Sequence, residues 1–138
     1  MALLEPGLRG QATRTVDATL TAEALGSGSL PVFGTPALLA LMEQAAVTAI
    51  EADLEPGVTS VGVFAELHHS APTPVGLDVR AEATLIAVEG RVLTFEITAY
   101  DEAEQIGRAI HRRVLVDVER FTQRVTDKGR QWLSPEVG

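Results

Sequence analysis

Three polar positions in an otherwise apolar part of the sequence could carry chemistry: Thr35, Glu43 and the pair His68-His69. A glutamate and a histidine together can form a base and its orienting partner, and a hydroxyl near a helix N-terminus can bind or attack a carbonyl group. A structural role is the alternative for each position. A lone histidine on an apolar face is more often a core residue than a catalyst, and a glutamate beside apolar residues can pair with an arginine or reach water.

Residues 34–51 are expected to form the long helix that positions Thr35 and Glu43. Thr35 can cap the helix N-terminus, and Pro36 fits the first helical position because its missing N–H is not needed there. The helix is apolar nearly all round, so it should be largely buried, and Glu43 interrupts that surface. Thr35 and Glu43 lie roughly 12 Å apart along the axis. A site that includes both would be completed by substrate or by a second subunit.

The hydrophobic pattern after this helix changes to the alternation typical of β-strands. Four strands are expected, paired in chain order as an antiparallel meander. Their ranges are 61–69, 77–88, 91–100 and 105–119. Before the helix, a first strand is expected at 11–18 and a helical turn at 21–25. A polar tail at 121–138 should hold one short helix.

Regular alternation in the strand at 61–69 separates its polar residues. Val61 and His69 fall on one face, and Gly62 and His68 fall on the other. The face of Val61 is the more apolar one, so His69 rather than His68 is expected to meet the helix. Adjacent histidines on opposite faces do not chelate a metal, so no metal site is expected.

An apolar helix followed by long hairpins predicts an antiparallel sheet wrapped around a long central helix. This is the hot-dog arrangement of the α+β class, and residues 1–138 are expected to form one such domain. The alternative is an open α+β sandwich with one helix on one face. The outer edge strand and the exposed side of the helix favour pairing of two protomers.

The composition excludes several classes of function. The chain has no cysteine, so a disulfide framework, a thiolate zinc site and a cysteine nucleophile are all ruled out. A net charge of −8 argues against nucleic-acid binding. No apolar run is long enough for a membrane span, and the N-terminal residues lack the pattern of a signal peptide. A cytoplasmic protein without a membrane partner is therefore expected.

The third histidine, His111, lies in the basic cluster 108–113, which contains Arg113. Solvated strand positions are the favoured interpretation of this cluster. Contact with a phosphate group is the alternative, because forked guanidinium groups suit phosphate oxygens.

Several motifs at these positions follow a known pattern. They are Gly34-Thr35 eight residues before Glu43, Leu54-Glu55-Pro56-Gly57 with Ser60-Val61-Gly62, His69 to Leu77, the turns at 88–91 and 101–107, and the last strand from Arg113 to Phe121. They belong to a match that runs from about Thr35 to Arg124, about two thirds of the chain, without needing alignment gaps. This stretch resembles fluoroacetyl-CoA thioesterase and its relatives in the hot-dog thioesterase superfamily.

The resemblance implies hydrolysis of a small or medium acyl-CoA thioester by a homodimer or a dimer of dimers, with sites at the subunit interface. Coenzyme A would enter as part of the substrate, and no other cofactor is implied. Thr35, Glu43 and His69 take the positions of the family's catalytic threonine, glutamate and histidine.

The resemblance also places Gly62 near the thioester and Arg113 near the site. A bulge must intervene in the strand if Gly62 and His69 both line one pocket. In the fluoroacetyl-specific enzyme, phenylalanines before the threonine form a hydrophobic lid. This chain keeps Phe33, but its loop at 26–29 is Gly-Ser-Gly-Ser and supplies no aromatic ring. That difference argues against fluoroacetyl specificity.

Two other functions stay open on this sequence. One is a hydratase or dehydratase of the same fold, in which a histidine and a carboxylate move protons on the acyl chain. The other is a non-catalytic module that binds acyl-CoA. A thioester carried by an acyl carrier protein is also an open substrate.

Overall fold

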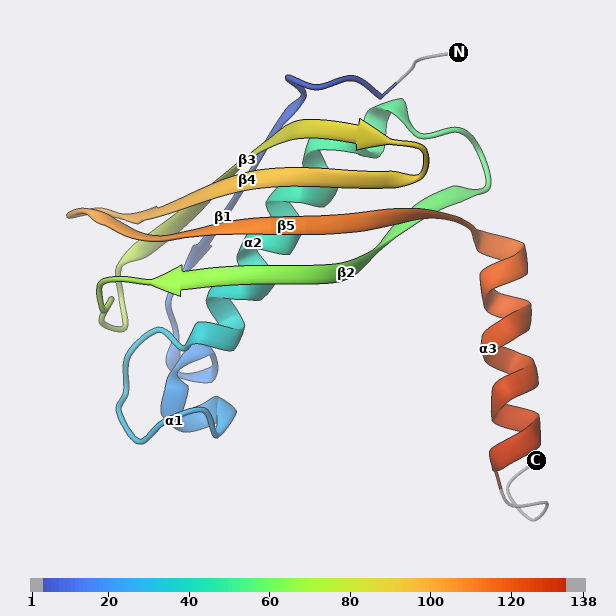
Figure 1. Cartoon of the computed structure of the whole chain (residues 1–138). Helices are drawn as coiled ribbons and strands as arrows, with labels where there is room; N and C mark the ends of the chain where they lie inside the picture. The colour runs from blue at the N-terminus through green and yellow to red at the C-terminus, as the bar shows by residue number, and fades with distance from the viewer. Residues whose placement is uncertain (1–3, 134–138) are drawn as a thin grey trace.

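A curled five-stranded antiparallel sheet packs around one long helix, α2, in the computed structural model of the chain, which describes residues 4–133 (Figure 1). The strands are β1 (Arg9–Thr15), β2 (Val58–His69), β3 (Asp78–Glu89), β4 (Val92–Asp101) and β5 (Gln105–Asp117). The α-helices are α1 (Ala22–Leu25), α2 (Thr35–Ile50) and α3 (Val118–Trp132), and 3₁₀ turns lie at η1 (Ala18–Leu20) and η2 (Glu51–Asp53). The expected elements are present, and the first strand begins two residues earlier than predicted.

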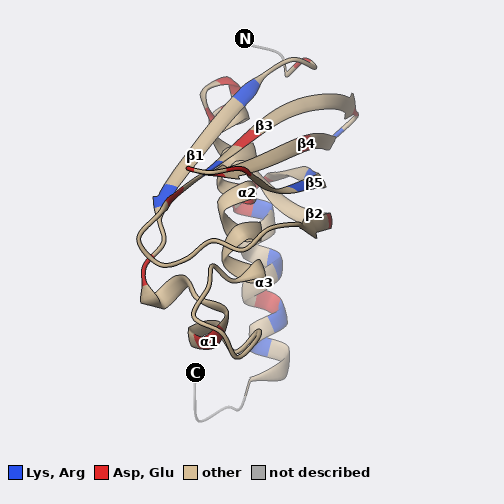
Figure 2. Ribbon diagram, turned by 90° about the vertical axis from the view of Figure 1, so that its left-hand side faces the viewer, with Lys and Arg blue, Asp and Glu red and all other residues tan. Residues whose placement is uncertain are grey.

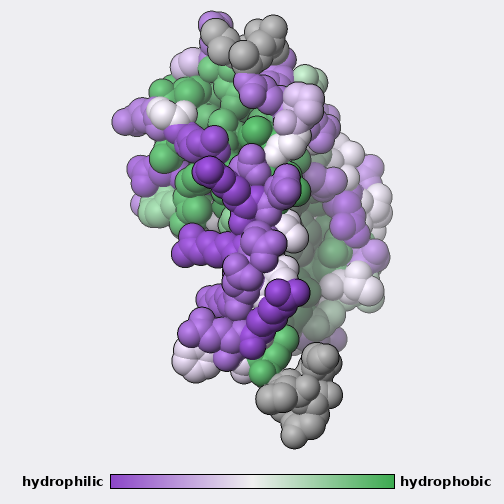
Figure 3. Space-filling model, turned by 90° about the vertical axis from the view of Figure 1, so that its right-hand side faces the viewer, coloured by the Kyte–Doolittle hydropathy of each residue, from purple (hydrophilic) through white to green (hydrophobic). Residues whose placement is uncertain are grey.

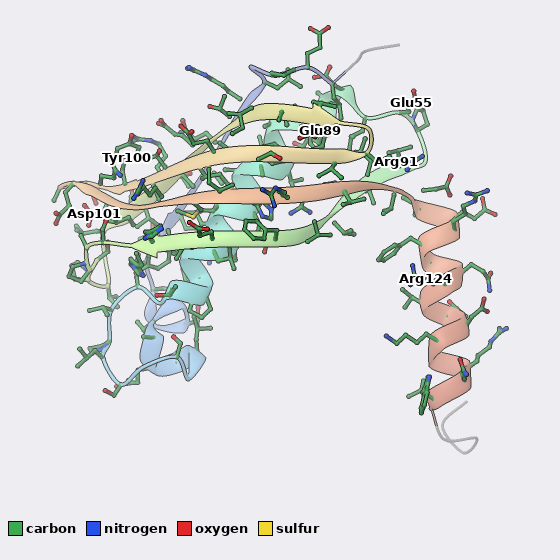
Figure 4. The ribbon with its side chains drawn as sticks, viewed as in Figure 1. Glu55, Glu89, Arg91, Tyr100, Asp101 and Arg124 are labelled. Carbon is green, nitrogen blue, oxygen red and sulfur yellow. The ribbon has the colours of Figure 1, made fainter. Side chains whose placement is uncertain are left out.

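The strands lie in the order β1-β3-β4-β5-β2, and all neighbouring pairs are antiparallel. The prediction of a four-strand meander was therefore wrong, because β2 pairs with β5 and not with β3. The connection between β2 and β3 crosses to the other side of the sheet. The fully buried Thr73 anchors it there by donating a hydrogen bond from its hydroxyl to Asp101 Oδ2 at 2.8 Å. Figure 4 labels Asp101 at this end of the sheet and Arg91 at the opposite end.

Helix α2 is buried along most of its length and packs mainly against β1 and β3. Its buried side chains are Leu38, Leu41, Met42, Ala45, Ala46, Ala49 and Ile50. The closest approach is at Gly10 of β1, where an added Cβ would lie 2.3 Å from the carbonyl oxygen of Ala45. Only glycine allows the strand and the helix to approach so closely.

The cap of α2 differs from the prediction. Gly34 is the N-cap residue and Thr35 is the first helical residue, so the Thr35 hydroxyl makes no capping hydrogen bond. Pro36 still lies in the first turn, where it removes no needed donor. The hydroxyl of Thr35 is therefore available for another partner.

A β-bulge interrupts β2 between Gly62 and Phe64. Gly62 lies opposite Arg113, and Phe64 lies opposite Arg112, so Val63 is the extra residue. Directly opposed residues share a face of an antiparallel sheet, and the extra residue shifts the alternation by one. Gly62 and His69 therefore both point to the inner face, as one shared pocket would require, and the regular alternation predicted for this strand was wrong.

Helix α3 extends away from the sheet and contacts its own chain mainly at the end of β5 (Figure 1). It is longer than the short helix expected in the tail and carries several Lys and Arg residues (Figure 2). The side facing away from the sheet is largely hydrophilic (Figure 3). Among residues 4–133, no helix is both long and apolar enough to cross a membrane.

Candidate active site

The hydroxyl of Thr35 and the ring of His69 meet where α2 begins and β2 ends. Thr35 Oγ1 lies 2.8 Å from His69 Nδ1, a hydrogen bond between residues 34 positions apart in the chain. Thr35 is exposed, whereas His69 is half-buried. The other ring nitrogen, Nε2, is buried and has no hydrogen-bond partner within residues 4–133. A histidine with one nitrogen on a hydroxyl can activate that hydroxyl or orient it.

A pocket of about 270 Å³ opens beside this pair. Its lining consists of Ala22, Ser27, Val32, Phe33, Thr35, His69, Ser70, Ala71 and Pro72. The ring of Phe33 is buried and stands edge-on to the ring of His69, with the centroids 6.4 Å apart. The Gly-Ser loop contributes Ser27, a small polar residue, to this wall.

The environment of His69 keeps its imidazole neutral. Burial lowers the pKa of His69 below its usual value, and the backbone of Ala71 acts in the opposite direction. A neutral imidazole at pH 7 can accept a proton, so His69 has the protonation state that a general base needs.

The carboxylate of Glu43 lies in a second cluster, further along α2. Its Oε2 accepts a hydrogen bond from Arg113 Nη1 at 3.2 Å. Arg113 is only 7% exposed, and it also donates from Nε to Ser60 Oγ at 2.8 Å and from Nη2 to the Ser60 carbonyl at 3.1 Å. Glu43 therefore has the arginine partner that its structural interpretation predicts, and that partner is Arg113. The Glu43 side chain remains 39% exposed, so this carboxylate is fixed on one side and open on the other.

Gly62 belongs to the Glu43 cluster. A Cβ at this position would lie 2.5 Å from Glu43 Oε2 and 3.2 Å from His111 Cε1. The absence of a side chain at Gly62 therefore makes room for the carboxylate at the bulge of β2.

His111 joins this second cluster, and the sequence interpretation missed it. The expectation of solvated positions was wrong for His111 and Arg113, which are 2% and 7% exposed. Arg108 and Arg112 are exposed on the other face of β5. Residues two positions apart in a strand share a face, so the apolar Ala109 was the signal that could have placed His111 on the buried face.

The ring of His111 is held on three sides. Nδ1 lies 2.7 Å from the carbonyl oxygen of Phe64, and Nε2 lies 3.1 Å from Arg113 Nη1. The ring also stacks on Phe95, with the centroids 6.2 Å apart. Burial is the main cause of a lowered pKa for His111; the nearby Arg113 lowers it further, whereas the Phe64 carbonyl and Glu43 oppose the shift.

The structure therefore divides the predicted site residues into two clusters. Phe33, Thr35 and His69 form one, and Glu43, Gly62 and Arg113 form the other. Glu43 and His69, which together could form a base and its orienting partner, lie in different clusters within one chain. Residues 4–133 contain no group of three or more His, Asp or Glu side chains placed to hold a metal ion.

Comparison with known proteins identifies relatives for this arrangement. The sequence profile of the family described as fluoroacetyl-CoA-specific thioesterase (FlK) matches residues 16–119. The fluoroacetyl-CoA thioesterase of Streptantibioticus cattleyicolor is 40% identical over 97 residues, which are 70% of this chain and 70% of that protein.

Solved structures show the same similarity. A point mutant of the fluoroacetyl-CoA-specific thioesterase FlK superposes with a TM-score of 0.86 at 33% identity, covering 93% of this chain and 99% of that one. The same mutant enzyme has been solved with fluoroacetate and CoA. A thioesterase superfamily member from Thermus thermophilus gives a TM-score of 0.87 at 25% identity and covers 96% of this chain and 98% of its own. These structures confirm the predicted hot-dog fold, and the chain belongs to the fluoroacetyl-CoA-specific thioesterase family.

Proposed function

We propose that this protein is a thioester hydrolase that cleaves small or medium acyl-CoA thioesters. The observation that carries the proposal is the 2.8 Å hydrogen bond between Thr35 Oγ1 and His69 Nδ1 at the wall of a pocket. The named thioesterases among its relatives support the same reaction. No cofactor other than the coenzyme A of the substrate is part of the proposal.

The reaction needs a nucleophile at the thioester carbonyl and a proton for the departing thiolate. Neutral His69 takes a proton from Thr35 or from a water held by that hydroxyl, and the oxygen attacks the carbonyl carbon. The C–S bond breaks, CoA leaves as a thiolate without strong acid catalysis, and protonated His69 then returns its proton to the sulfur. If Thr35 attacks, water then hydrolyses the acyl-enzyme. Glu43, fixed by Arg113 at Oε2, uses its exposed side to orient or deprotonate that water.

A homodimer would bring the two clusters into one site. Helix α2 packs mainly on β1 and β3. Helix α2 reaches the inner face of β2 only near Gly62 and His69, and Ala65 between them is exposed. If the free edges of two β2 strands pair in antiparallel fashion, the two α2 helices lie side by side in opposite directions. The Thr35 end of one helix then approaches the Glu43 half of the other. Further pairing into a dimer of dimers stays a prediction, as does the cytoplasmic location.

The wall of the pocket supports a substrate range without fluoroacetyl specificity. Ser27 of the loop at 26–29 lines the pocket, and this loop has no aromatic residue that could form a hydrophobic lid. Phe33 is the aromatic residue of the wall, and it is packed against His69. A wall of this kind admits small or medium acyl groups with little selection for a fluorine substituent.

Thiol release from a panel of acyl-CoA esters tests the proposal. The panel contains short, long, aromatic and halogenated acyl groups. We expect turnover of at least one ester, with kcat reduced about 100-fold or more in Glu43→Gln and in His69→Ala. His68→Ala is the matched control, because His68 is the adjacent residue on the opposite, exposed face.

Two results would redirect the assignment. Full activity of Glu43→Gln would remove Glu43 from the mechanism. Loss of an enoyl thioester without thiol release would instead favour the hydratase alternative, and tight CoA-ester binding without any turnover would favour a binding module. Running the same panel on acyl-carrier-protein thioesters distinguishes the two carriers.

A further inference from the structure

The side chain that determines where Glu43 lies is Arg113, and Arg113 is itself fixed by other groups. Its Nε and Nη2 are bound to Ser60, at 2.8 and 3.1 Å. Its Nη1 lies between Glu43 Oε2 at 3.2 Å and His111 Nε2 at 3.1 Å. Ser60 therefore fixes one edge of the guanidinium, and His111 is the group that faces the nitrogen bound to Glu43.

The hydrogen-bond inventory determines the tautomer of His111. A guanidinium has donors and no acceptor, so His111 Nε2 must accept from Arg113 Nη1. The proton then resides on Nδ1, which donates to the carbonyl oxygen of Phe64 at 2.7 Å. Only the neutral ring can do both, because a protonated ring has no acceptor.

The surroundings of the ring agree with this state. Arg113 from β5 and Glu43 from α2 are the charged groups recorded against the His111 ring, with Glu43 Oε2 at 3.8 Å from Nε2. β2 presents the Phe64 carbonyl and β4 presents the Phe95 ring. A proton on Nε2 would point at the guanidinium. The neutral tautomer is thus the one that this packing accommodates.

We propose that His111 is a positioning residue for the reaction: by accepting from Arg113 Nη1, it aims the guanidinium that holds the Glu43 carboxylate against Gly62. The inference rests on the proposed thioesterase function. His111 is 2% exposed and does not touch the pocket beside Thr35. Its effect on the reaction passes through Arg113 and Glu43.

Steady-state kinetics of two His111 variants test this role. His111→Phe keeps a flat ring against Phe95 and removes both hydrogen bonds. We expect its kcat to fall about tenfold, because Arg113 loses a buried acceptor, while KM changes less than about twofold. His111→Asn can still donate to a carbonyl and accept from Arg113, so it should recover kcat to within about threefold of wild type.

A packing control separates positioning from general loosening of the core. Phe95→Leu disturbs the contact beneath the imidazole but leaves both hydrogen bonds of His111 in place. We expect it to lower the melting temperature while kcat stays within about twofold of wild type. A purely structural role predicts that kcat falls alike in Phe95→Leu and His111→Phe, and equal losses would overturn the inference.

Coupling to Arg113 gives an independent readout. In an Arg113→Lys background, the His111→Phe change is expected to reduce kcat by less than about twofold more, because both act through one guanidinium. A further tenfold loss in that background would mean that His111 acts by another route.

The tautomer can be measured with His111 itself in place, so this readout does not depend on a His111 variant that folds. The chain has three histidines, so the imidazole ¹⁵N signals can be assigned by substituting His68 and His69 in turn. At pH 7 we expect His111 to be neutral, protonated on Nδ1 and unprotonated on Nε2. A protonated Nε2 would overturn the inference. Wild-type protein without turnover would instead count against the proposed function, and the tautomer would still be decided.

Discussion

The protonation of two histidines, the half-buried His69 and the buried His111, links the chemistry of this site to the stability of the fold. Burial lowers the pKa of His69 and of His111, so the folded chain binds their protons less readily than the unfolded chain. Each ring therefore contributes stability that is fully present above the unfolded pKa of about 6.5 and is lost as the pH falls through the lower folded value. Protonation also removes the two ring nitrogens that accept hydrogen bonds, His69 Nδ1 from Thr35 and His111 Nε2 from Arg113.

We accordingly expect the free energy of unfolding to fall between pH 7.5 and pH 5.5, as measured by urea denaturation. The variant carrying His69→Asn and His111→Asn should show a smaller difference between the two pH values than wild type. His68→Asn should keep the wild-type difference, because His68 is exposed on the outer face of β2. An unchanged difference in the double variant would contradict the role of burial.

The catalytic candidates were visible in the sequence because each is a polar residue in an apolar segment. Their partners were not visible, since Thr35 and His69 are joined only when the start of α2 reaches the end of β2. Arg113 and His111 were harder to place. A short basic run is usually solvated, but in a paired strand the two-residue alternation turns His111 and Arg113 inward and leaves Arg108 and Arg112 exposed.

At the scale of elements, the distance between β1 and α2 depends on one glycine. A Cβ at Gly10 would lie 2.3 Å from both Ala45 O and Ala49 N, which are backbone atoms that cannot rotate away. We expect Gly10→Ala to lower the free energy of unfolding by about 3 kcal/mol, at the upper end for overpacking. Chemical denaturation with an unchanged m-value is the measurement.

Gly129→Ala is the matched control, with the opposite sign. Gly129 lies within α3, where a Cβ would make an ordinary contact of 3.6 Å with Leu133 Cδ1. Alanine in an exposed helix interior is favoured by about 0.5–1 kcal/mol over glycine, so this variant should be slightly more stable. Equal stability of Gly10→Ala and wild type would mean that β1 can move away from α2 at little energetic expense.

The elements themselves followed from periodicity, whereas their pairing did not. Strand alternation located β2 to β5 within a few residues, and an apolar helix pattern located α2. Nothing local distinguishes β2 pairing with β3 from β2 pairing with β5. The buried Thr73 and its bond to Asp101 hold the connection on the far side of the sheet, a contact between residues 28 positions apart that no local pattern reveals. The hydrophobic pattern of β2 gave no sign of the bulge after Gly62. The bulge was expected only if Gly62 and His69 both line one pocket, as the resemblance implied.

At the scale of the molecule, β2 is a long edge strand that leaves a sheet surface without cover. Its bulge residue Val63 is 56% exposed, and exposed apolar edges of this length normally pair with another chain. We expect wild-type protein to sediment at twice the monomer mass. Val63→Lys should shift it to the monomer by adding a charge on each side of the two-fold interface.

Ile86→Lys separates an edge effect from a general effect of lysine. Ile86 is also the extra residue of a bulge and is 44% exposed, but its strand, β3, lies between β1 and β4. The Ile86→Lys variant should therefore remain dimeric and active.

If the active site needs Thr35 from one protomer and Glu43 from the other, Val63→Lys should lose thioesterase activity in parallel with the dimer. Activity should return at protein concentrations that restore association. A monomeric Val63→Lys with full activity at low concentration would show that each chain assembles its site alone.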